Sequence, residues 1–174
     1  MSWAIRPAGP GDAGMLATFG WRVFVETYGH GVGSAQMQAY LSEHYTPDAT
    51  ARVLADPDVH TLVVTGASSE DWFGYAQIRR APVPECVPER AALQIWRFYV
   101  DRPWHGRGVA AALMAACLEA VREQGAPAAW LMVWEHNARA LAFYRKHGFD
   151  VVGQEIFRLA SEEHIDPVLV RTLQ

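Results

Sequence analysis

One stretch of the chain constrains its fold more than any other: a glycine-containing turn between a strand-like run and a helix-like run. Residues 91–100 are rich in β-branched and aromatic side chains, which predicts a strand, and residues 111–122 are strong helix formers. The turn between them contains Gly106 and Gly108. Such a turn exposes backbone N–H groups at the positive end of a helix dipole, and its glycines let an anion approach without a Cβ in the way. The order of strand, turn and helix therefore predicts an anion site, most often one for phosphate.

The turn does not match two common phosphate-binding loops. A Walker loop requires Gly-Lys-Ser/Thr, whereas Gly108 is followed by Val-Ala. A dinucleotide-binding loop requires a third glycine, and an acidic residue about 20 positions on at the end of a second strand. Glu123 stands near that distance, but at the end of the predicted helix. Two basic residues, Arg102 and Arg107, lie beside the turn.

A second strand and a capped helix follow the first pair. Residues 128–134 are nearly all apolar and predict a buried strand. Asn137 is a good N-cap for a helix over residues 138–147. Gly148 suits the left-handed position after the helix end, and the basic residues 145–147 suit its last turn.

The two segments together resemble the GCN5-related N-acetyltransferases, the GNAT superfamily. The pyrophosphate loop of that family is typically Gln/Arg-Gly-x-Gly-x-Gly/Ala, which residues 105–110 match except at His105. A later family signature, Asn-x-x-Ala-x-x-Phe-Tyr, is matched by Asn137, Ala140, Phe143 and Tyr144. The resemblance covers residues 91–157 most strongly.

A narrower likeness is to bacterial spermidine/spermine N-acetyltransferases of the Pai type. Residues 134–137, the aromatic stretch 24–28 and the tail 157–160 are similar to those enzymes. Pai-type enzymes usually carry glutamates in the strand before the loop. This chain has Gln94 and Trp96 there instead.

The resemblance implies an α/β (α+β) fold with a mixed central sheet flanked by helices, as a single domain over residues 1–174. It implies acetyl-CoA bound between splayed parallel strands, and transfer of its acetyl group to a primary amine. A small cationic amine such as a polyamine is the expected acceptor. Two alternatives stay open: acetylation of a protein N-terminus or lysine, and a non-catalytic coenzyme A-binding regulator.

The remaining pattern agrees with a mixed sheet, because strands that pair antiparallel are followed by strands that alternate with helices. Further strands are predicted at residues 3–6, 60–65, 73–79, 151–158 and 168–172. Further helices are predicted from the cap Asp12 to about Thr27, from the cap Ser34 to about His44, and from Asp48 to about Ala55.

The resemblance also assigns roles to residues. Tyr144 stands at the family position for the acid that protonates the departing thiolate. The expected contacts to acetyl-CoA are Phe98, Tyr99, Val100, His105, Gly106, Arg107, Gly108, Val109, Ala110, Asn137 and Tyr144. The peptide groups of residues 98–100 are expected to pair with the pantetheine arm, as a short strand would.

The base that deprotonates the acceptor amine stays open. Neither Gln94 nor Trp96 is a base, so the candidates are Glu135, His136, Glu26 and His30. An amine of pKa near 10 must lose a proton before it attacks.

The first two helices are expected to form the acceptor pocket. Its predicted lining is Phe24, Glu26, Tyr28, Tyr40 and Glu43. Carboxylates beside aromatic rings suit a cationic amine. Phe24 and Tyr28 stand four residues apart on the same helix face, so the sequence is equally consistent with these two rings packing together in the core.

Composition narrows the class further. The net charge of −4 argues against nucleic acid as a main partner, and no apolar run approaches the about 20 residues of a membrane span. The first residues lack a signal-peptide core, which predicts a cytoplasmic protein. Cys86 and Cys117 are expected to be unpaired, and the seven histidines show no metal-ligand spacing. A homodimer stays open.

Overall fold

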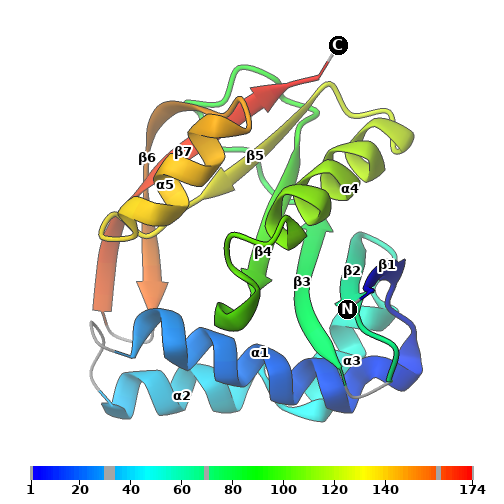
Figure 1. Ribbon diagram of the computed structural model, residues 1–174. Helices are drawn as coiled ribbons and strands as arrows, with labels where there is room; N and C mark the ends of the chain where they lie inside the picture. The colour runs from blue at the N-terminus through cyan, green and yellow to red at the C-terminus, as the bar shows by residue number, and fades with distance from the viewer. Residues whose placement is uncertain (1, 30–33, 69–70, 160–161, 174) are drawn as a thin grey trace.

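A computed structural model describes residues 2–29, 34–68, 71–159 and 162–173, and their strands form one mixed sheet of seven strands (Figure 1). The strands are β1 (Ala4–Pro7), β2 (Val59–Thr65), β3 (Trp72–Arg79), β4 (Leu93–Val100), β5 (Ala128–Met132), β6 (Asp150–Leu159) and β7 (Glu162–Thr172). Their order in the sheet is β1-β2-β3-β4-β5-β7-β6, and only β4 and β5 pair in parallel. The predicted mixed sheet with flanking helices is confirmed.

The helices cover both faces of the sheet. They are α1 (Ala13–Tyr28), α2 (Ser34–His44), α3 (Pro47–Ala55), α4 (Val109–Glu123) and α5 (Ala138–Lys146), with short 3-10 turns η1 (Pro10–Asp12) and η2 (Arg102–Trp104). Successive side chains along a strand point to opposite faces of the sheet, so each face packs its own hydrophobic core against the helices that cover it. Leu62 and Ala76 pack with the residues of α4, whereas the neighbouring Val63 and Tyr75 pack with those of α1. Figure 1 shows α4 and α5 on one side, and α1 with α2 at the other.

The parallel strands β4 and β5 separate soon after they meet. They pair only at Leu93 with Ala129 and at Gln94 with Trp130. On its other side β4 pairs with β3, where the register shifts because Trp96 is skipped as a bulge. A bulge bends the strand that carries it. The separation, visible in Figure 1, leaves one backbone edge of β4 without a strand beyond Gln94.

Several predicted element ends shift in the structure. Helix α3 begins at Pro47 rather than at Asp48, and Thr46 is its N-cap, because the Thr46 side chain accepts a hydrogen bond from Ala49 N at 3.2 Å. Asp12 occupies the N-cap position of α1 as predicted, but its side chain makes no cap hydrogen bond to the helix, because its carboxylate accepts from Gly9 N at 2.8 Å.

The last strand differs more. The predicted strand over residues 168–172 is the end of β7, which begins at Glu162 and continues through Pro167. Proline is rare in the middle of a strand, so a sequence-based prediction ends the strand at Pro167 and does not include the first half of β7. The predicted buried strand over residues 128–134 ends earlier, at Met132.

Candidate active site

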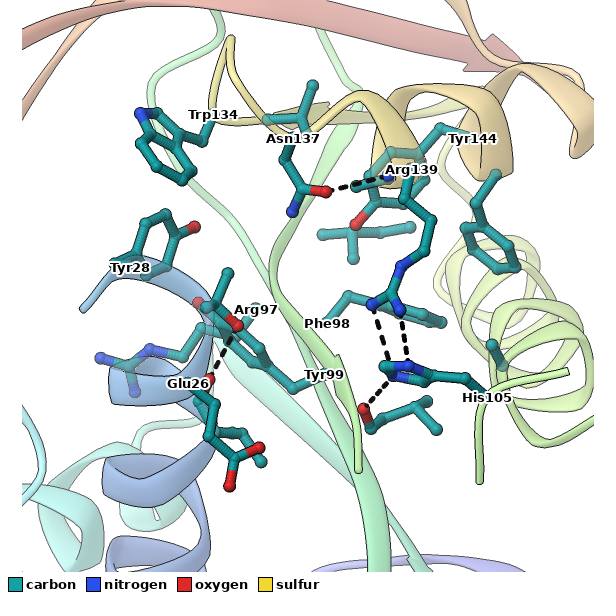
Figure 2. Close-up of a pocket in the computed structure, with 18 of the residues that line it drawn as sticks. Glu26, Tyr28, Arg97, Phe98, Tyr99, His105, Trp134, Asn137, Arg139 and Tyr144 are labelled. Atoms are coloured by element: carbon teal, nitrogen blue, oxygen red, sulfur yellow. Dashed lines mark hydrogen bonds between the residues drawn. The ribbon is translucent and has the colours of Figure 1, made fainter. Parts of the chain in front are cut away.

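A cleft of about 570 Å³ opens where β4 and β5 separate, between α1, α5 and the glycine turn (Figure 2). Ten of the sequence-predicted site residues line it: Glu26, Tyr28, Phe98, Tyr99, Val100, His105, Gly106, Ala110, Asn137 and Tyr144. The predicted residues Arg107, Gly108 and Val109 belong to the adjoining turn and the start of α4. The fold thus brings both ends of the predicted site to one cleft.

The glycine turn presents backbone donors at the start of α4. Gly106 and Gly108 have φ angles of +73° and +85°, the left-handed region that favours glycine. A Cβ at either position would meet no atom within 4 Å, so the space above the turn is open. Ala112 N donates to Gly108 O at 3.0 Å, and the three preceding amides are the first-turn donors that a helix leaves unpaired. Val109 is fully buried and fixes the helix start in the core.

The exposed edge of β4 forms the floor of the cleft. Phe98 packs against Phe143 and Tyr144 of α5, with ring centroids 5.6 and 6.2 Å away. Tyr99 points to the other face and stacks on Tyr75 at 5.5 Å. These contacts fix the backbone of residues 98–100 and leave its edge facing the cleft.

His105 joins three elements by its two ring nitrogens. Nε2 lies 2.7 Å from Val100 O, and Nδ1 lies 2.6 Å from Arg139 Nη1 (Figure 2). A carbonyl only accepts and a guanidinium only donates, so Nε2 carries the proton and Nδ1 accepts. His105 is therefore held with the proton on Nε2, between the turn, β4 and α5.

Tyr144 and Asn137 come from the two ends of the predicted family signature on α5. Tyr144 is 8 % exposed, and its ring reaches from α5 toward Phe98 (Figure 2). Burial raises the pKa of Tyr144, so the hydroxyl is protonated at neutral pH. Asn137 Oδ1 accepts a hydrogen bond from Ala140 N at 3.1 Å, which confirms the predicted N-cap.

The acceptor-side prediction divides into residues inside and outside the cleft. Tyr28 lines the cleft and lies 5.5 Å from Trp134 between ring centroids. Phe24 and Tyr40 stack on each other at 4.9 Å, in a buried aromatic cluster with Tyr45, and are not among the residues that line the cleft. The structure therefore corrects the placement of these two: they pack behind the cleft wall.

The predicted carboxylates also differ in place. Glu26 lines the cleft but is paired with Arg22 at 3.0 Å. Glu43 has a side chain 76 % exposed beside His44, outside the cleft lining. Only Glu26 of the two acidic residues faces the site.

The candidate bases give a similar result. His136 lines the cleft with its side chain 68 % exposed, and its Nε2 lies 3.8 Å from Glu135 Oε1. His30 lies outside the described residues. The sequence argument missed Asp166, which is 4 % exposed and accepts a hydrogen bond from Glu135 N at 3.3 Å. Burial raises the pKa of Asp166.

Two arginines were also missed. Arg97 lines the cleft at 7 % exposure, and Arg79 stands on the neighbouring strand. Arg97 follows the bulge at Trp96, so its direction depends on strand pairing. The signal in the sequence is an arginine within an otherwise apolar and aromatic strand run.

Comparison with known proteins agrees with this geometry. The family model described as "Acetyltransferase (GNAT) family" matches residues 21–149. The chain belongs to that family. It is an acetyltransferase that uses acetyl-CoA as cosubstrate, as the sequence predicts.

The relatives are similar along nearly the whole chain. An uncharacterized N-acetyltransferase of Mycobacterium bovis is 30 % identical over 162 residues, 93 % of this chain and 98 % of the relative. The PaiA N-acetyltransferase from Thermoplasma acidophilum, solved in complex with coenzyme A, has a TM-score of 0.77 at 17 % identity and covers 99 % of this chain and 100 % of its own. NAA60 of Arabidopsis thaliana, solved with acetyl-CoA, has a TM-score of 0.74 at 14 % identity, with 99 % of each chain covered. These two structures share the fold.

The described residues contain neither a cluster of metal-binding side chains nor a membrane-spanning helix. Among the residues that the structure describes, no group of three or more His, Cys, Asp or Glu side chains could hold a metal ion. No helix in the same ranges is long and apolar enough to cross a membrane.

Proposed function

We propose that this acetyltransferase acts on the primary amine of a small molecule, which enters the cleft beside α1. The observation that carries the proposal is the cleft itself. Its lining includes Tyr144, Gly106 of the glycine turn, and Glu26 and Tyr28 of α1, and Figure 2 shows the two α1 residues across the cleft from His105. A donor with a phosphate end and an acceptor could thus meet at Tyr144 from opposite sides.

The turn and the edge of β4 fit the cosubstrate. We infer that the backbone of residues 106–110 binds its pyrophosphate, supported by the left-handed glycines and the open space above them. The backbone edge of residues 98–100 is left without a strand and fits an extended arm. When bound, acetyl-CoA supplies the acetyl group as a thioester.

Tyr144 is the proposed general acid. As the amine nitrogen bonds to the acetyl carbon, the carbon–sulfur bond breaks, and the departing thiolate takes a proton from the Tyr144 hydroxyl. The raised pKa of Tyr144 supports this role in one respect: the hydroxyl still holds its proton at the pH where amines react.

His136 is the described base candidate that the geometry favours. It lines the cleft, whereas Glu26 is already paired with Arg22. A neutral imidazole could accept the amine proton directly or through one water.

The choice of amine follows from the charges on the cleft wall. A polyamine is expected to bind beside Glu26, Glu43, Tyr28 and Tyr40. Glu26 and Tyr28 line the cleft, and Glu26 is the only one of the two carboxylates that does. The structure therefore gives a second cationic group little to pair with. An amine without further positive charge is the better supported acceptor.

The test is acetyl-CoA consumption across a panel of amines, with free-thiol release as the readout. The panel holds monoamines, spermidine, amino acids and a peptide with a free N-terminus. Turnover of small amines supports the proposal. Turnover of the peptide alone would replace it with protein acetylation. For spermidine, Glu26→Gln should raise KM more than for a neutral amine, and less so at high salt.

A further inference from the structure

Two arginines with no acidic partner meet at one side of the cleft. The guanidinium carbons of Arg79 and Arg97 lie 3.9 and 4.0 Å from the centroid of the Trp96 ring. Arg97 Nη1 donates to Gln77 Oε1 at 3.0 Å, and Arg79 Nε donates to Gln94 Oε1 at 2.7 Å. Both acceptors are neutral amides. Within the described ranges, no carboxylate forms an ion pair with either arginine.

Arg97 is the more deeply placed of the two. It is 7 % exposed, and although the Tyr40 hydroxyl lies beside its guanidinium, Nη2 makes no hydrogen bond of normal geometry with the described residues. A buried charge without a counter-ion costs several kcal/mol, and an apolar side chain of similar size would fill the space without that cost. The rings of Tyr45 and Trp96 offer only their π faces, with the guanidinium 4.6 and 4.0 Å from the centroids.

The second arginine adds to the unbalanced charge. Burial and the neighbouring charge of Arg97 lower the pKa of Arg79, which remains a cation at neutral pH. Two positive charges and no negative one therefore stand around Trp96. A second cation, such as the far end of a polyamine, would be repelled here.

The position of this pair separates it from the phosphate end. Figure 2 shows the Arg97 side chain below Tyr28, across the cleft from His105 and Arg139. Trp96 and Arg97 both line the same cleft as Tyr144. The uncompensated charge thus lies on the side where the acceptor is proposed to enter.

We propose that Arg97, supported by Arg79, binds a carboxylate of the acceptor, so that the substrate is an amine that also carries a carboxylate, as amino acids do. A carboxylate is planar and matches the fork of a guanidinium with two parallel hydrogen bonds. It would supply the unpaired Nη2 with an acceptor and neutralise the pair. This inference rests on the proposed function, because it names the class of small amine.

The experiment compares matched amines that differ only by the carboxylate. Glycine, 3-aminopropanoate, 4-aminobutanoate and 5-aminopentanoate are each paired with the amine left when the carboxylate is removed, and L-lysine with 1,5-diaminopentane. The series covers several amine–carboxylate spacings. We expect at least one pair in which kcat/KM favours the carboxylate by about 10- to 100-fold, the usual worth of a hydrogen bond to a charged group.

Variants then assign the preference to the arginines. Arg97→Gln should remove most of it by raising KM for the carboxylate compound more than KM for the matched plain amine. Arg79→Gln is the second variant, on a partly exposed side chain that tolerates change better. Arg80→Gln is the matched control, because Arg80 is the exposed next residue and is not in the cleft lining. Thermal unfolding by circular dichroism checks that each variant folds.

The outcomes separate the two proposals. If plain amines are acetylated and no carboxylate improves turnover, the carboxylate site is wrong and the small-amine function stands. The site is equally wrong if Arg97→Gln and Arg79→Gln both fold and leave the preference unchanged. If no amine is acetylated, the proposed function fails. Calorimetry of the amino acid series on coenzyme A-loaded protein then tests the site alone, and equal binding of both members of every pair would overturn it.

Discussion

At the scale of single residues, one hydroxyl group distinguishes catalysis from packing in this cleft. Tyr144→Phe keeps the ring that packs on Phe98 and removes only the proton donor. Turnover should fall by about 100-fold or more while coenzyme A affinity stays within about twofold, as for loss of a general acid. Steady-state kinetics and calorimetry measure the two quantities. Tyr75→Phe is the control, because it removes a fully buried hydroxyl from a residue outside the cleft lining.

The pH dependence gives a second check on the same residue. Because burial raises the pKa of Tyr144, its acid form persists between pH 7 and pH 9. In that range turnover should rise with pH, as more of the acceptor amine loses its proton. A fall in turnover across that range, absent from Tyr144→Phe, would contradict this assignment.

A matched pair of glycines tests the phosphate end. Gly108 and Gly125 have similar left-handed φ angles, +85° and +71°, and a Cβ at either meets no atom within 4 Å. Valine at either position should cost about 1–2 kcal/mol of stability through backbone strain. Only Gly108→Val should also weaken coenzyme A binding, by about tenfold or more, because its side chain occupies the approach to the helix donors. Equal affinity of the two variants by calorimetry would remove the pyrophosphate from this turn.

At the scale of elements, sequence reasoning reached the parts of the site that depend on local order. The strand, turn and helix around Gly106 and the cap at Asn137 are set by neighbouring residues, so their patterns predict them. The direction of Arg97 depends on the bulge at Trp96, which arises from pairing between β3 and β4. A register shift reverses the face that a side chain occupies, and periodicity within one strand does not reveal it.

Strand β7 shows the same limit for a carboxylate. Pro167 makes the segment look like a loop, so Asp166 reads as an exposed residue, whereas it lies buried in the long strand. Its hydrogen bond with the Glu135 amide links β7 to the segment after β5. The acceptor side of the cleft is therefore built by contacts between elements far apart in sequence.

The buried carboxylate of β7 leads to a stability prediction. Burial raises the folded-state pKa of Asp166 above its unfolded value, so the fold favours the protonated form. Stability from this group is complete below the unfolded pKa and is lost as pH rises through the folded one. Asp166→Asn, which can still accept from Glu135 N, should therefore raise the melting temperature at pH 8, and by less at pH 4.

The control for this prediction is Asp150→Asn, on an exposed residue of β6. Thermal unfolding followed by circular dichroism gives the change in melting temperature that each of the two variants causes at pH 8 and at pH 4. A gain from Asp166→Asn that is equal at pH 8 and pH 4 would mean that charge burial is not its cause.

At the scale of the whole molecule, the net charge and the local charge have opposite signs. The chain carries a formal charge of −4, which alone would repel a polyanion such as coenzyme A. The described cleft lining nevertheless includes Arg97, Arg102 and Arg139, with Glu26 as its one carboxylate. Salt screens distant charges more than near ones. The distance of each charge from the bound coenzyme A therefore decides whether the negative net charge or the positive cleft controls binding.

We expect the local charge to control the rate at which coenzyme A binds. At 0.1 M salt the screening length is about 10 Å, so the approaching phosphates feel the cleft arginines more than the rest of the surface. Association should therefore slow by about tenfold as salt rises from about 0.05 to 0.5 M, as for attractive steering. Stopped-flow tryptophan fluorescence measures the rate. Arg102→Gln should reduce this salt dependence, whereas Arg158→Gln, on an exposed pair with Glu163, should not. A rate that rises with salt would mean that the net negative charge governs the encounter.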